Sequence, residues 1–242
     1  MKKNVWLVFF LLYCTCCASF GFADDLTYTK PQTASLDIDL SKVAVIIAPF
    51  DGSSIAYRYE AARGKKPSCI ETYRTLRIRA ITPAEGKLYL FIPKKHVLES
   101  CTIHTNGAAL TIEGLQAAHA LITANGGSVT LTQSAIKSAV LTVARSTLAL
   151  DLRILGSCAL SMSASTADIA FEGAADQYHL DYMHSNSSFT IDSTQYPKSP
   201  GEYGNPKSKR RLIISAGSSQ AAVRFIPQEA SEKSGTGYKI LP

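Results

Sequence analysis

Apolar and polar residues alternate along most of the chain, and from position 98 onward the alternation recurs with a period of about 19 to 20. Aligning the repeats on one apolar position gives successive spacings of 19, 19, 19 and 20, at Ile103, Ile122, Leu141, Leu160 and Leu180. A period of two is typical of β-strands, whose side chains point to opposite faces in turn. A fixed repeat of this length is typical of solenoids, in which each unit buries its apolar face against its neighbours. The pattern therefore predicts an all-β fold, a single-stranded β-solenoid of about six or seven coils.

Each repeat is predicted to contribute two strands whose inward side chains stack in columns from one repeat to the next. On the first strand the columns are Cys101, Ala120, Ala139, Cys158, Tyr178; Ile103, Ile122, Leu141, Leu160, Leu180; and Thr105, Ala124, Val143, Met162, Tyr182. On the second strand they are Leu110, Val129, Leu148, Ile169, Phe189; and Ile112, Leu131, Leu150, Phe171, Ile191. Short segments rich in Gly, Asn and Ser separate the two strands and favour turns.

One domain is expected to extend from residue 36 to residue 226, with strands already present before the first regular repeat. These early strands are predicted at 36–40, 43–47, 55–59, 75–79 and 88–92. A Pro- and Gly-rich segment, 193–209, predicts an insertion in the last coil, which resumes at Leu212. Because an open sheet edge would pair with another chain, 36–78 is expected to cap one end and the insertion or the tail the other. The flanking segments are interpreted as a leader (24–35) and a flexible tail (227–242).

The segment 1–23 has the pattern of a secretory signal peptide. Lys2 and Lys3 precede an apolar run, and Gly21 and Ala23 supply the small residues of a cleavage site. Export to the periplasm or the cell surface is therefore expected, with no membrane-spanning segment after cleavage. Two alternatives stay open, namely an uncleaved membrane anchor and a lipoprotein attached through a cysteine of this region.

Three cysteines, Cys69, Cys101 and Cys158, follow the predicted signal peptide. Cys101 and Cys158 share a predicted column but lie three coils apart, which is roughly 14 Å at the usual strand spacing. A disulfide requires Cα atoms within about 7 Å. We therefore predict that these two residues are core side chains and form no disulfide with each other.

The formal charge of +6 falls to +4 when Lys2 and Lys3 are removed, which mildly favours anionic partners. The chain has no nucleotide-binding loop, no HExxH or GxSxG motif, and no CxxC after position 23. We therefore expect no enzyme activity, no cofactor and no metal site, and an exported protein is a poor candidate for binding nucleic acid. His179 and Asp181 share an outward strand face and are interpreted as solvated polar residues.

Two sets of residues could carry a function. The insertion and its basic end, Tyr196, Tyr203, Lys207, Lys209, Arg210 and Arg211, could bind an anionic glycan, a lipid surface or a protein. The alternative hypothesis is a polysaccharide-cleaving enzyme. It uses Asp151 and Glu172, which the predicted outward column places about 5 Å apart, a separation that suits two catalytic carboxylates.

Three segments resemble a known family: the apolar strand 88–92 ending in Pro93, the segment 102–114 with its Asn106-Gly107 turn, and the coil around Asn125-Gly126-Gly127. They are similar to the bacterial family named "putative adhesins" (the DUF4097 type), and the resemblance covers about residues 36 to 225. It implies a right-handed β-solenoid of the cell envelope with no catalytic motif and no cofactor. The expected function is thus a non-enzymatic interaction module exported to the envelope or surface.

Overall fold

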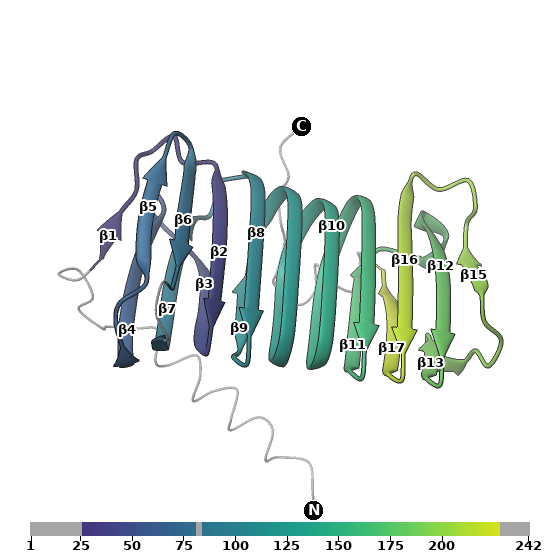
Figure 1. The fold of residues 1–242 in the computed structure, drawn as a ribbon. Coiled ribbons are helices and arrows are strands. Elements are labelled where there is room, and N and C mark those ends of the chain that lie inside the picture. Colours follow the sequence, from purple (N-terminus) through teal and green to yellow (C-terminus); the bar gives the residue numbers. More distant parts are fainter. Residues whose placement is uncertain (1–25, 81–83, 228–242) are drawn as a thin grey trace, which may run out of the picture.

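The computed structural model describes residues 26–80 and 84–227, and within them the chain forms one open, non-closed sheet of 17 strands (Figure 1). The predicted all-β fold is confirmed, since the described part contains no α-helix and a single 3-10 turn, η2 (Ala175–Gln177). The predicted signal peptide (1–23) and nearly all of the predicted tail (228–242) lie outside the described residues. The strands are β1 (Thr27–Tyr28), β2 (Ser35–Ser41), β3 (Val43–Phe50), β4 (Ala56–Gly64), β5 (Ser68–Thr72), β6 (Thr75–Arg79), β7 (Ala84–Pro93), β8 (Leu98–Asn106), β9 (Leu110–Glu113), β10 (Gln116–Ser163), β11 (Thr166–Glu172), β12 (Tyr178–Ser185), β13 (Ser188–Ile191), β14 (Thr194–Gln195), β15 (Gly201–Gly204), β16 (Arg210–Gly217) and β17 (Gln220–Ile226).

Parallel ladders join segments that lie one repeat apart in the sequence, as the alignment predicts. Ile122 of β10 pairs with Ile103 of β8, and Val129 of β10 pairs with Leu110 of β9. The alternating apolar side chains of these strands are buried and belong to one continuous core cluster. The first two members of each predicted column are therefore confirmed as neighbours.

The order of the last repeats differs from their order in the sequence. Strand β16 lies between β10 and β12, so that Ile214 pairs with Leu160 on one side and with Tyr182 on the other. Likewise β17 lies between β11 and β13. The predicted contact between Leu160 and Leu180 is wrong, because the C-terminal repeat is inserted between these two strands.

The later columns are also displaced by two positions. Leu148 pairs with Ala167 and Leu150 with Ile169, whereas the sequence alignment placed Leu148 beside Ile169. The spacing from β10 to β11 is thus the same as in the preceding repeats. The residues that make the next repeat longer than 19 lie after Phe171, at the corner that contains η2. An alignment on apolar positions cannot locate an insertion there.

The N-terminal end has the same inserted arrangement. β2 pairs with β6 on one side and β8 on the other, so that Leu36 lies between Leu76 and Cys101. β3 lies in the same way between β7 and β9. The first repeat of the chain is therefore an interior repeat, and the second repeat covers it.

Antiparallel strands cover both ends of the parallel stack. At one end β4 pairs with β7 and β5 with β6, and at the other β15 pairs with β12 (Figure 1). Strand β14 pairs with β13 at this second end. Exposed parallel edges would otherwise be templates for pairing with another chain. Of the segments expected to cap the stack, these are the strands that do so.

A ladder of serine side chains runs along one corner of the stack. Ser165 Oγ accepts a hydrogen bond from the backbone N–H of Ser146 at 3.2 Å and donates to the carbonyl of Ser163. In the same way, Ser219 Oγ accepts a hydrogen bond from the Ser165 N–H, and Ser187 Oγ accepts one from the Ser219 N–H. The ladder follows the spatial order of the repeats, in which the repeat of Ser219 lies between those of Ser165 and Ser187.

The three described cysteines are free, and Cys101 and Cys158 are buried, which agrees with the predicted absence of a disulfide between them. Burial raises the pKa of each of these two thiols to about 12. Within the described residues, no helix has the length and apolar character needed to cross a membrane.

Candidate functional site

The two tyrosines of the insertion close the end of the core. Tyr196 packs edge-on against Tyr182 with ring centroids 5.8 Å apart, and Tyr203 stacks on Phe225 at 5.9 Å. The Tyr203 hydroxyl donates a hydrogen bond to a carboxylate oxygen of Asp192 at 3.1 Å. Both rings are half-buried, so their main role is packing, and they offer little surface to a partner.

The basic residues of the insertion divide into two groups. Arg210 is partly buried, with its guanidinium 5.5 Å from the centre of the Tyr178 ring and Nη1 3.2 Å from the side-chain oxygen of Gln177. Lys207, Lys209 and Arg211 are exposed, and none of them forms an ion pair with any described residue. Of the predicted binding residues, these three are the ones available to a ligand.

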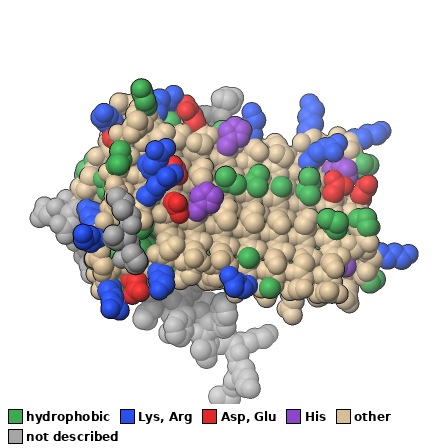
Figure 2. All heavy atoms as spheres, viewed as in Figure 1, with side chains coloured by type: hydrophobic (Ala, Val, Ile, Leu, Met, Phe, Trp, Pro, Cys, Tyr) green, Lys and Arg blue, Asp and Glu red, His purple; other side chains and the backbone are tan. Residues whose placement is uncertain are grey.

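An outward row of apolar side chains leads toward the same end of the sheet. Leu121 and Val140 lie one repeat apart, and the row continues through Ala159 to Ile213 on β16. Leu121, Val140 and Ile213 are 40%, 44% and 50% exposed. Figure 2 shows a line of hydrophobic side chains crossing this face and ending at acidic ones. In the ladder, Ile213 is followed by Asp181 of β12 and then by Glu202 of β15.

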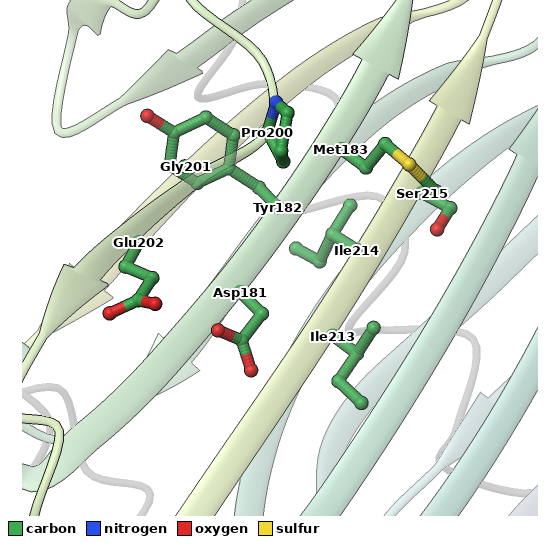
Figure 3. A pocket seen from close by; sticks show the side chains of 9 residues that line it. All are labelled: Asp181, Tyr182, Met183, Pro200, Gly201, Glu202, Ile213, Ile214 and Ser215. Atoms are coloured by element: carbon green, nitrogen blue, oxygen red, sulfur yellow. The ribbon is translucent and has the colours of Figure 1, made fainter.

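A hollow of about 270 Å³ lies where this row ends (Figure 3). Asp181, Met183, Pro200, Glu202 and Ile213 are among the residues that line it. The apolar side chains come from β12, β16 and the segment before β15, and the two carboxylates come from neighbouring strands. The hollow thus combines an apolar floor with an acidic edge.

A histidine completes a cluster with these two carboxylates. His179 Nε2 lies 3.4 Å from Asp181 Oδ1 and 3.7 Å from Glu202 Oε2. His179 and Asp181 occupy alternate positions of β12, while Glu202 faces Asp181 across the antiparallel ladder between β12 and β15. The His179 side chain is 10% exposed, and neither of its ring nitrogens has a hydrogen-bond partner among the described residues.

Comparison with known proteins supports a shared fold. No family model matches the chain. The chain is 26% identical over 208 residues to an uncharacterized protein of Treponema pallidum, which covers 84% of this chain and 85% of that protein. Its structure resembles the crystal structure of a putative cell adhesion protein from Clostridium sporogenes, with a TM-score of 0.50 and 8% sequence identity. The likeness is one of fold, and it covers 84% of this chain and 98% of the other.

The two carboxylates of the enzyme hypothesis do not face each other. Asp151 pairs with Ala170 on β11, whereas Glu172 lies two positions further along and pairs with Ile226 on its other side. The predicted separation of about 5 Å rested on an alignment that was displaced by two positions. Burial raises the pKa of Asp151, and the nearby Arg224 guanidinium partly opposes this effect. The offset removes the direct pairing of Asp151 and Glu172 on which the retaining geometry of about 5 Å depended.

Sequence reasoning placed His179 and Asp181 on one face but missed Glu202. The missing information was the hairpin, since Glu202 reaches Asp181 only because residues 186–200 turn the chain back onto the edge of β12. The segment Gly201–Gly204 has the alternation of a short strand, which is the one signal in the sequence that could have indicated it.

Proposed function

We propose that this protein is an exported interaction module of the cell envelope or surface, similar in role to an adhesin, which binds an anionic macromolecule and catalyses no reaction. In this proposal the stack is a right-handed β-solenoid of about six or seven coils. The parallel ladders, which advance by one repeat from strand to strand, support that architecture. The fold shared with the putative cell adhesion protein of Clostridium sporogenes supports the adhesin-like role.

The observation that carries the binding proposal is the set of exposed cations without ion-pair partners between residue 207 and the start of β16. Some basic residues elsewhere form ion pairs, for example Arg77 with Asp37 and Arg224 with Asp168, each at 2.8 Å. Lys207, Lys209 and Arg211 have no such partner in the described part of the chain. Exposed cations without internal partners attract anionic surfaces, with a strength that falls as salt is added.

A binding assay with two anionic probes tests this proposal. Immobilised heparin represents an acidic glycan, and vesicles containing phosphatidylserine represent a lipid surface. The variant K207Q/K209Q/R211Q should bind at least tenfold more weakly, because each lost contact contributes about 1 kcal/mol near an anionic surface. Raising the salt concentration should weaken binding of the unmodified protein and have less effect on the variant.

A matched control removes the same charge at the opposite end of the stack. Arg63, Lys65 and Lys66 are also exposed, so R63Q/K65Q/K66Q changes the net charge equally. Binding that falls equally in both variants would show that only net charge matters and would reject the proposed surface. Glycan turnover that is lost in D151N or E172Q would contradict the non-enzymatic role.

A further inference from the structure

We propose that His179, Asp181 and Glu202 form a binding site for a divalent transition-metal ion, with zinc as the best match to this ligand set. None of the basic residues discussed above is a ligand of this site, although Arg211 lies next to His179 in the ladder. It joins two strands, because His179 and Asp181 belong to β12 while Glu202 belongs to β15. A bound ion would therefore attach the covering strand to the edge of the stack.

The distances between the ligand atoms fit a tetrahedral ion. Zinc binds imidazole nitrogen and carboxylate oxygen at about 2.0 to 2.2 Å, so two tetrahedral ligand atoms lie about 3.4 Å apart. The distances from His179 Nε2 to the two carboxylates are 3.4 and 3.7 Å. All three ligand atoms lie within 4.8 Å of one another, so only a small rotation of the carboxylates is needed. The Asp181 and Glu202 side chains are 41% and 71% exposed, which leaves them free to make it.

The buried imidazole is the second, independent observation. His179 is 8% exposed, yet both of its ring nitrogens are buried without a hydrogen-bond partner among the described residues. A buried polar group without a partner is costly, and native structures normally satisfy it. A metal ion on Nε2 would satisfy that nitrogen, and the ring proton would then reside on Nδ1.

Competing explanations account less well for this arrangement. A hydrogen-bonded ion pair between imidazolium and carboxylate requires about 2.7 to 2.9 Å, which is shorter than both observed distances. Calcium and magnesium prefer six or more oxygen ligands, whereas this site offers a nitrogen and two carboxylates. Arg211 on β16 is the neighbour of His179 in the ladder, and among the described residues it forms no ion pair with Asp181 or Glu202. Imidazole and carboxylate together suit zinc and its neighbours in the first transition series.

A site of this kind would stabilise a weakly attached strand. β15 is short and pairs only with β12 among the described strands, and none of its side chains is fully buried. Three protein ligands would leave the fourth tetrahedral position for water. The expected consequence of binding is therefore a firmer covering of the sheet edge.

Titration of the metal-free full chain with zinc chloride in a calorimeter tests the proposal. We expect one ion per chain, and a rise in melting temperature when zinc is added. Replacing zinc with cobalt(II) should give the visible absorption of a tetrahedral site. The variants H179Q, D181N and E202Q should each bind zinc at least tenfold more weakly, while calcium and magnesium should not compete.

Two variants keep the result interpretable. Glu202 is largely exposed, so E202Q should fold normally even if a change at the buried His179 does not. H119Q removes an exposed histidine outside the cluster and should leave zinc binding unchanged. The proposal is rejected if zinc does not bind with one-to-one stoichiometry, or if E202Q and D181N bind it as tightly as the unmodified chain.

Discussion

A cysteine pair can test the inserted position of the last repeat. Ser161 of β10 pairs with Ser215 of β16, and Ser215 in turn pairs with Met183 of β12. These positions point outward, so cysteine in place of serine leaves the core unchanged. The informative variants are S161C/S215C and S161C/M183C, each made together with C69S to remove the partly exposed native thiol.

Strand spacing sets the magnitude of the expected difference. Neighbouring strands lie about 4.8 Å apart, so two strands with one other strand between them lie about 9.6 Å apart. A disulfide requires Cα atoms about 4.4 to 6.8 Å apart. Ser161 is therefore within bonding range of Ser215 and out of range of Met183. A loop closed between positions 161 and 215 should also raise the free energy of unfolding by about 4 kcal/mol.

Mild oxidation followed by non-reducing digestion and mass spectrometry measures both cross-links. S161C/S215C should be oxidised nearly completely and should unfold at a higher urea concentration than its reduced form. S161C/M183C should remain reduced. If the second pair forms the disulfide and the first does not, the repeats are stacked in sequence order and the inserted arrangement is wrong.

Three further predictions concern the corner, the thiols and the covered edge. S165A removes the acceptor of the buried Ser146 N–H and should lower the free energy of unfolding by about 1 to 3 kcal/mol in urea titrations, whereas exposed serines should tolerate alanine. Cys101 and Cys158 keep their protons in the folded state up to a pKa of about 12, compared with an ordinary value of 9.0. The unfolded chain therefore binds fewer protons above about pH 9, so stability should fall as the pH rises, and less steeply in C101A/C158A. Replacing residues 197–208 with a short Gly-Ser linker should expose the edge of β12 and produce oligomers in size-exclusion chromatography, whereas a monomer would show that this edge needs no cover.

The fold class follows from local pattern, and the sequence was sufficient for it. Alternation along β8 and β10 and the constant spacing of the repeats predict the strands, their inward faces and the first columns, because side-chain direction in a strand depends only on position. Register was predicted less well beyond Leu150. A strand can shift by two positions in an alignment of apolar residues and still keep every apolar side chain on the core face. The sequence therefore could not distinguish the pairing of Leu148 with Ala167 from its pairing with Ile169.

The candidate site was less predictable because it depends on chain reversal. His179 and Asp181 occupy alternate positions on one strand, and their common face follows from alternation. Glu202 is added by an antiparallel pairing whose turn contains no short, characteristic hairpin signal. The burial of His179 depends on the same pairing, so the feature that distinguishes it from a solvated histidine could not be read from the residues around it.

The inserted order of the repeats has a common physical cause at both ends. Apolar columns are chemically equivalent, so Leu160 could pack on β12 as well as on β16. The covering strands remove this freedom. β15 follows β13 closely in the chain and pairs with β12, so it occupies one edge of β12 and leaves β16 only the other. β5 precedes β6 and occupies its outer edge in the same way, which leaves the inner edge to β2. At each end, the outermost repeat is the one whose free edge pairs with a short antiparallel strand, and the first or last repeat of the chain lies inside it. The need to cover the exposed edges therefore determines the order of the repeats in the stack.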